Sequence, residues 1–296
     1  MKISEINLAM GEIKVKVTDL FNHPDLINKT GIEYVYETTK TTKQLAVEAA
    51  KNLSYSDANL LMLVTQSPDD YLPANSLGVH AELGFSSDTF AFDFNQGCSG
   101  FVQSFLVANS LIKEHKKILL ITADRYRSKL NPSDRSTNAV FSDGAAAMIL
   151  EDDNQHKILY KNHLTDGSKR HMLYHANSAE NDGYLHMSGA DLWMFTKLEV
   201  VPQINEAINF CKDNSITIKG IYYHQASKLV VDGIKAGLQA DISLVKENYF
   251  NRANTVSSTI PALIKDEPFQ LSSSEAVIFA GFGVGLTSTV LVYGRE

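Results

Sequence analysis

The chain has 296 residues, of which 44% are hydrophobic and 21% charged, and its formal net charge is −7. This composition is typical of globular proteins, and the negative charge argues against a nucleic-acid-binding protein, which would carry a basic face. The two cysteines form neither a disulfide framework nor a paired zinc motif, and the N-terminal segment has no signal-peptide core, so we expect a cytoplasmic protein without a metal site or a membrane span.

Apolar runs alternate with amphipathic stretches through the first half. Residues 2–17 alternate well enough to predict one or two strands, with Gly11 as the turn of a hairpin. Further strands are predicted at residues 59–65, 90–94, 117–122 and 145–150, and helices at residues 41–53, 75–83 and 99–114. The run at 59–65 is apolar throughout, as in strands buried on both faces of a parallel sheet. This order predicts an α/β fold.

The second half repeats the pattern. Strands are predicted at residues 157–164, 218–223, 275–280 and 286–293, and helices at residues 191–214 and 227–238. Residues 166–188 contain His, Asn and Gly without periodicity and are predicted to form one long loop, of a kind that is usually functional or mobile.

The two halves can be laid over each other, which indicates an internal duplication. The matched segments are 61–66 with 220–225, 94–98 with 250–254, and 119–123 with 277–281. We therefore predict two halves, residues 1–152 and 153–296. The match places Cys98 and Asn254 at equivalent turns, which can face one shared cleft at the carboxyl ends of strands.

Cys98 follows a predicted strand and a tight turn, and it opens a predicted helix. A helix N-terminus has backbone N–H groups without partners and a positive dipole end, and both favour the thiolate form of a cysteine. A nucleophilic role competes with that of a small buried core residue.

Three downstream features add to this picture. His224 ends a predicted strand, Asn254 precedes a predicted helix, and residues 281–285 form a glycine-rich turn. Alone, each fits a structural role. Together with Cys98 they supply what acyl transfer through a thioester needs, namely a nucleophile, two donors to a thioester oxygen, and backbone N–H groups of Cys98, Gly283 and Val284 for an oxyanion hole.

The set of motifs resembles the ketoacyl-ACP synthase III family of the thiolase superfamily, over about residues 30–296. The matching segments are Gly97-Cys98-Ser99-Gly100-Phe101, His224-Gln225-Ala226-Ser227, the 254–261 segment beginning Asn254-Thr255, and the segments 131–135, 141–145 and 281–285. The resemblance implies a five-layered αβαβα fold of two duplicated halves, a homodimer, and acyl-CoA or acyl carrier protein thioesters as substrates without a further cofactor.

The resemblance also implies a catalytic cycle. Cys98 takes an acyl group, a malonyl thioester is decarboxylated with His224 and Asn254 stabilising the enolate, and the carbanion attacks the acyl-cysteine to give a 3-ketoacyl thioester. Arg135 corresponds to an arginine that helps to hold CoA. Leu72 corresponds to a residue that closes the acyl tunnel of the partner subunit.

Some segments depart from the family pattern. Residues 25–33 replace an aromatic-plus-arginine element that clamps CoA, so that Lys29 keeps one positive charge, and the basic residue after the His224 segment is displaced to Lys228. These departures favour a specialised pathway. Two other functions stay open, an acyltransferase that moves the acyl group from Cys98 to a hydroxyl or amine, and a non-catalytic partner of a heterodimer.

Overall fold

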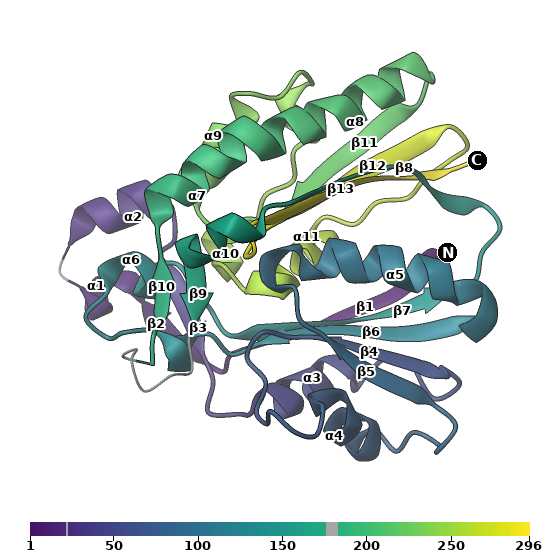
Figure 1. The fold of residues 1–296 in the computed structure, drawn as a ribbon, viewed down its shortest axis with the longest axis horizontal. Coiled ribbons are helices and arrows are strands. Elements are labelled where there is room, and N and C mark those ends of the chain that lie inside the picture. Colours follow the sequence, from purple (N-terminus) through teal and green to yellow (C-terminus); the bar gives the residue numbers. More distant parts are fainter. Residues whose placement is uncertain (22, 176–182) are drawn as a thin grey trace.

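The computed structural model describes residues 1–21, 23–175 and 183–296. Two main β-sheets stack with helices between them and helices on both outer faces, which gives five layers (Figure 1). This arrangement confirms the predicted αβαβα fold.

The first sheet contains strands from the first half of the chain. Its order is β1 (Lys2–Met10), β7 (Gly144–Glu151), β6 (Lys117–Asp124), β4 (Leu60–Val64) and β5 (Phe90–Phe94). β4 is parallel to both neighbours, whereas β7 is antiparallel to β6 and to β1. Every residue of β4 is buried, as expected for an apolar strand covered on both faces.

The second sheet repeats this topology. Its order is β11 (Thr217–Tyr223), β12 (Glu275–Gly283), β13 (Thr287–Arg295) and β8 (His156–Thr165), with β11 parallel to β12 and the other pairs antiparallel. Four strands of the first sheet, in the order β4, β6, β7 and β1, have the same order and relative directions as these four strands. This is what the predicted duplication requires. The halves differ before the matched turns, because β5 precedes Cys98 whereas a short helix, α10 (Tyr249–Arg252), precedes Asn254.

Three layers of helices cover the sheets. α5 (Gly100–His115) and α11 (Thr259–Asp266) lie between the sheets, where the rings of Phe105, Phe279 and Tyr293 pack within 6 Å of one another. α3 (Thr42–Ala50) and α4 (Asn75–Glu82) cover the outer face of the first sheet, and α8 (Val201–Asp213) and α9 (Lys228–Lys235) that of the second. The remaining elements are α1 (Val17–Leu20), α2 (Pro24–Thr30), α6 (Arg135–Asn138), α7 (Gly189–Phe195), β2 (Ile13–Lys16), β3 (Tyr34–Glu37), β9 (Leu173–His175), β10 (Leu185–Met187) and several short 3-10 or π turns.

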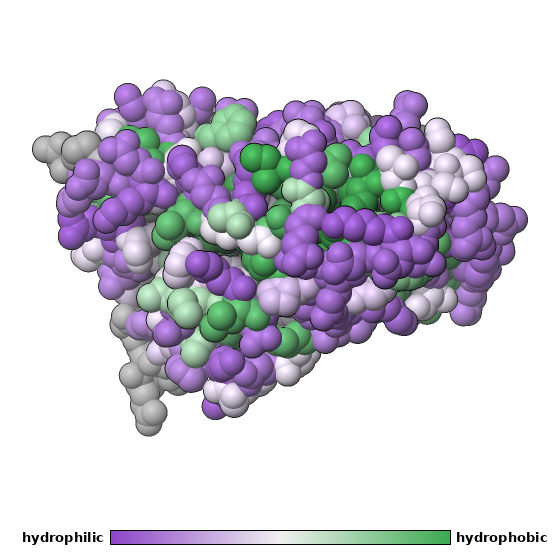
Figure 2. All heavy atoms as spheres, turned by 90° about the horizontal axis from the view of Figure 1, so that it is seen from above, coloured by the Kyte–Doolittle hydropathy of each residue, from purple (hydrophilic) through white to green (hydrophobic). Residues whose placement is uncertain are grey.

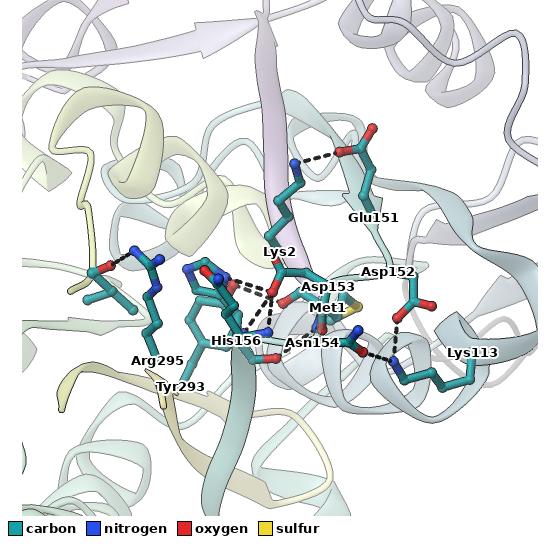
Figure 3. Close-up of polar contacts among 12 residues, drawn as sticks. Met1, Lys2, Lys113, Glu151, Asp152, Asp153, Asn154, His156, Tyr293 and Arg295 are labelled. Carbon is teal, nitrogen blue, oxygen red and sulfur yellow. Dashed lines mark hydrogen bonds and ion pairs between the residues drawn. The ribbon is translucent and has the colours of Figure 1, made fainter. Parts of the chain in front are cut away.

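The start of β1 joins the two halves. The Tyr293 hydroxyl donates to the Met1 carbonyl at 2.9 Å, and the amino group of Met1 donates to the His156 carbonyl at 2.8 Å (Figure 3). The His156 ring stacks on Tyr293. β1 therefore contacts β8 and β13 of the second sheet while it pairs within the first.

Two sequence-based predictions are wrong. β1 and β2 do not form a hairpin at Gly11, because β1 pairs with β7 and β2 pairs with β3. The segment 166–188 is not one loop, since its described part contains a 3-10 segment, Gly167–Met172, and the antiparallel pair β9 and β10. Residues 176–182 of that segment lie outside the described part.

The surface on the side of α8 and α9 is mainly hydrophilic, with hydrophobic residues visible between the polar ones (Figure 2). None of the described helices is long and apolar enough to cross a membrane.

Candidate active site

Cys98 lies on a short 3-10 turn, Gly97–Ser99, between β5 and α5. The cysteine is 4% exposed. Gly97 has φ +49°, and a Cβ on it would lie 2.2 Å from the Gln66 side-chain oxygen. Only glycine therefore fits this turn, which brings the following cysteine close to the backbone of the second half.

His224 and Asn254 line the same small cavity as Cys98, whose volume is about 50 Å³. His224 follows β11, and Asn254 is held in place by a bridge to the first half, in which its N–H donates to the Val140 carbonyl at 2.9 Å. The other lining side chains are mainly apolar and include Phe141, Leu173, Met187, Leu192, Phe195 and Phe282. The structure thus brings the three predicted residues together in a small, mainly apolar site.

The glycine-rich turn after β12 closes over the thiol. Gly283 has φ +149°, and a Cβ on it would lie 2.8 Å from the Cys98 Cβ and 3.3 Å from its Sγ. The backbone N–H groups of Cys98 and Val284 both interact with the thiol. Residues predicted for the oxyanion hole therefore surround Cys98, and a side chain at position 283 would displace it.

The two titratable groups of the site are neutral near pH 7. Burial, followed by the negative charge of Asp124, raises the pKa of the Cys98 thiol to about 12, although the two backbone N–H groups oppose this. Burial lowers the pKa of the His224 imidazole to about 3. The expectation that the helix start favours a thiolate is wrong for the free protein, because loss of solvation outweighs the local dipoles.

One hydrogen-bonded loop positions both His224 and Asn254. The Val256 N–H donates to the Asn254 Oδ1 at 2.9 Å, which leaves the Nδ2 donors of that amide for the cavity. The Thr259 hydroxyl lies 2.8 Å from His224 Nδ1 and 3.1 Å from the Val256 carbonyl oxygen. Since a hydroxyl has one hydrogen, it can donate to only one of these two groups at a time.

Asp124 is a residue that sequence reasoning missed. This carboxylate ends β6, is fully buried, and accepts hydrogen bonds from the Gln66 N–H at 2.8 Å and from both the N–H and the hydroxyl of Ser257. Burial raises its pKa to about 6. Its one signal in the sequence is an aspartate two residues after the apolar run at 117–122.

The four predicted substrate-binding residues do not line the cavity. Arg135 begins α6 and Lys29 lies on α2, both exposed, while Leu72 is 90% exposed before Pro73. Lys228 begins α9 and pairs with Asp232.

A family model for 3-oxoacyl-[acyl-carrier-protein] synthase III matches residues 92–167. The beta-ketoacyl-[acyl-carrier-protein] synthase III of Streptococcus pneumoniae (strain Hungary19A-6) is 28% identical over 98% of both chains. The chain is thus similar, over nearly its whole length, to ketoacyl-ACP synthase III enzymes. A crystal structure of a 3-oxoacyl-(acyl-carrier-protein) synthase III superposes with a TM-score of 0.89 at 24% identity, over 98% of each chain. That of Pseudomonas aeruginosa PAO1 superposes with a TM-score of 0.86 at 24% identity, over 99% of this chain and 97% of that one.

These similarities confirm the predicted resemblance to the synthase III family and the thiolase-like fold, and they indicate an acyltransferase of the synthase III type.

The raised pKa of the Cys98 thiol can be tested directly. Because its thiol pKa is about 12, alkylation by iodoacetamide should rise about tenfold per pH unit from pH 7 to pH 9, as the thiolate fraction does. Intact-protein mass spectrometry measures the rate, and Cys98→Ala corrects for labelling of Cys211. A plateau near pH 8.5, as for an ordinary cysteine, would contradict the burial argument.

Proposed function

We propose that the protein makes a 3-ketoacyl thioester by decarboxylative condensation of an acyl-CoA or acyl-ACP with a malonyl thioester. The observation that supports this best is the common cavity of Cys98, His224 and Asn254, in which the thiol and the imidazole are both neutral. A reaction through a carbanion needs hydrogen-bond donors to the enolate oxygen, but no acidic group that would protonate the carbanion. A small apolar cavity also keeps water away from the carbanion.

In the first half-reaction the Cys98 sulfur attacks the acyl thioester carbonyl. The negative charge that forms on the carbonyl oxygen is accepted by backbone N–H groups of Cys98 and of the Gly283-Val284 turn. The bond to the CoA sulfur then breaks, and CoA leaves as the thiol with the proton that Cys98 gives up.

In the second half-reaction the malonyl thioester loses CO₂, and the electrons of the broken C–C bond form an enolate. The Asn254 amide and the His224 Nε2–H donate hydrogen bonds to the enolate oxygen. The enolate carbon attacks the acyl-cysteine carbonyl, the C–S bond breaks, and the Cys98 thiolate that leaves takes up a proton from solvent.

The positions of Lys29 and Lys228 support recognition of the phosphate groups of CoA or of an acyl carrier protein. α2 lies against α9, because a Cβ on Gly31, at the end of α2, would lie 2.8 Å from the Lys228 Cβ. Ala226 and Val230, on either side of Lys228 in sequence, line the cavity. We propose that Lys29, Lys228 and Arg135 contact the phosphates, and that the altered 25–33 segment serves a specialised pathway.

The assignment of Asn254 gives the test of this function. The wild-type protein should gain an acyl adduct from acyl-CoA that a malonyl-thioester chase removes with release of CO₂. Asn254→Ala should still form the adduct, but decarboxylation should fall roughly 10²–10³-fold because one enolate donor is lost. Intact mass and release of labelled CO₂ measure the two steps.

Cys98→Ala should form no adduct, and Cys211→Ser, on α8, should behave like the wild type. Unchanged CO₂ release in Asn254→Ala would refute its enolate role. An adduct that persists in the wild type through the chase would favour a hydroxyl or amine acceptor instead.

We propose that Thr259 determines which ring nitrogen of His224 carries the proton. His224 can donate from Nε2 only when the Thr259 hydroxyl turns its hydrogen to Nδ1. In Thr259→Val the hydroxyl is lost, and the Val256 carbonyl remains as the hydrogen-bond partner of the His224 ring. A carbonyl can only accept a hydrogen bond, so the proton of the imidazole should stay on Nδ1 and leave Nε2 without a hydrogen to donate. Decarboxylation should therefore fall roughly 10²-fold, while acylation of Cys98 changes little.

Thr259→Ser keeps the hydroxyl and should retain decarboxylation. The ¹⁵N chemical shifts of the His224 ring report the tautomer directly. Equal losses in both half-reactions of Thr259→Val would indicate a structural role only.

We also propose a homodimer formed along β5. Among the described strands this one has a neighbour on one side only, and exposed apolar side chains lie near it, including Phe90 on β5 and Leu77 on α4. Unpaired, apolar edge strands readily pair with a second copy of the same chain.

Analytical ultracentrifugation should therefore give twice the 32.7 kDa of one chain. Phe90→Lys should shift the protein toward monomer, because the partner would bury the charge. Ile242→Lys, a matched exposed apolar position on the second half, should leave the dimer intact. A monomer at micromolar concentration would contradict the proposal.

A further inference from the structure

A second cavity, of about 290 Å³, adjoins the Cys98 site. It shares Leu173 with the smaller cavity, and its lining residues Tyr126, Leu173 and Leu185 belong to the apolar cluster that contains Cys98. Val284, whose N–H interacts with the thiol, also lines it.

The position of this cavity matters for the proposed two-step reaction. The acyl group stays on Cys98 while CoA leaves and a second thioester enters. The small cavity at His224 and Asn254 must then receive the second thioester, so the acyl chain needs separate space. The larger cavity, which shares Leu173 with the small one, can provide that space.

The lining of the larger cavity is polar, in contrast to that of the small one. Its polar side chains are Gln66, Asn95, Tyr126, Arg170, Tyr174 and His175, and none of the described residues that line it is acidic.

One wall is held rigidly. The Tyr126 hydroxyl donates to the Gln66 Oε1 at 2.9 Å, and the Tyr126 ring stacks on Phe141. The Gln66 side chain also lies against Gly97. With its oxygen occupied, this amide has its N–H donors left for a ligand.

Arg170 brings a positive charge to the lining of this cavity. Within the described part of the chain Arg170 forms no ion pair, whereas Arg127 pairs with Glu37 and Arg252 pairs with Asp266. In a chain with a net charge of −7, a guanidinium that has no carboxylate partner among the described residues, at a cavity whose described lining holds no carboxylate, favours an anionic ligand.

We propose that the larger cavity receives an acyl chain that ends in a carboxylate, so that the donor is the monothioester of a short dicarboxylic acid. Arg170 binds the carboxylate, and the amide of Gln66 contributes a further donor. This inference rests on the proposed acyl-Cys98 step and adds the substrate class.

The test compares three donors of similar length: glutaryl-CoA, its neutral amide glutaramoyl-CoA, and hexanoyl-CoA. Intact mass spectrometry follows the initial rate of adduct formation on Cys98. The wild type should react with glutaryl-CoA on the order of tenfold faster than with either neutral donor, because only the carboxylate makes charge-assisted hydrogen bonds. Arg170→Leu should lose this preference while it still reacts with hexanoyl-CoA.

Lys169→Leu is the matched control, since Lys169 pairs with Asp166 and does not line the cavity. It should keep the preference. A wild type that reacts faster with hexanoyl-CoA, or an Arg170→Leu variant with an unchanged preference, would overturn the inference and leave the condensing function intact. Absence of an adduct with all three donors would overturn the acyl-cysteine step itself, and the inference with it.

Discussion

The buried carboxylate of Asp124 is the interaction on which the geometry of the site depends. It ends β6 at the interface of the two halves and accepts hydrogen bonds from Gln66, after β4, and from Ser257, in the loop after Asn254. Gln66 supports the turn of Cys98, and the Asn254 loop holds His224 through Thr259. One charge thus sets the distance between nucleophile and donors. Burying a charged carboxylate costs free energy, and the hydrogen bonds that Asp124 accepts offset this cost.

Burial also determines the chemistry that the site can perform. A thiol with a pKa of about 12 and an imidazole with a pKa of about 3 do not exchange a proton at rest. In the proposed reaction, the attack of Cys98 must therefore be coupled to loss of its proton, and backbone N–H groups would stabilise the negative charge that forms. The imidazole that stays neutral can act as a hydrogen-bond donor without acting as an acid, and an acid would quench the carbanion.

Most of the fold could be predicted from the sequence, because its buried strands are continuous apolar runs. The run at 59–65 became β4, and the run at 117–122 became the start of β6. The pairing of β1 could not be predicted, since its partner β7 is more than 100 residues away and a local turn signal at Gly11 competes with it. The strands within 166–188 were missed because each has only three residues.

For the site, the internal duplication placed Cys98 and Asn254 at one cleft, the family resemblance added His224, and all three line one cavity. Their protonation states could not be predicted in this way, because desolvation depends on the side chains that close the cavity, such as Phe141 and Phe282, which come from distant segments. Asp124 was missed for the same reason. A polar residue at the end of a strand becomes informative only when its partners from the other half are known.

The duplication explains why the site is asymmetric. Equivalent turns follow β5 in the first half and α10 in the second. In the first half the turn leads through a 3-10 segment into the long α5, which places a sulfur among backbone N–H groups. In the second half the chain passes from Asn254 through Val256, at φ +55°, and Asn254 lines the same cavity as Cys98 and His224. The turn of the first half thus brings Cys98 to the cavity, the corresponding turn of the second half brings Asn254, and the cavity forms where the two halves pack face to face around α5 and α11.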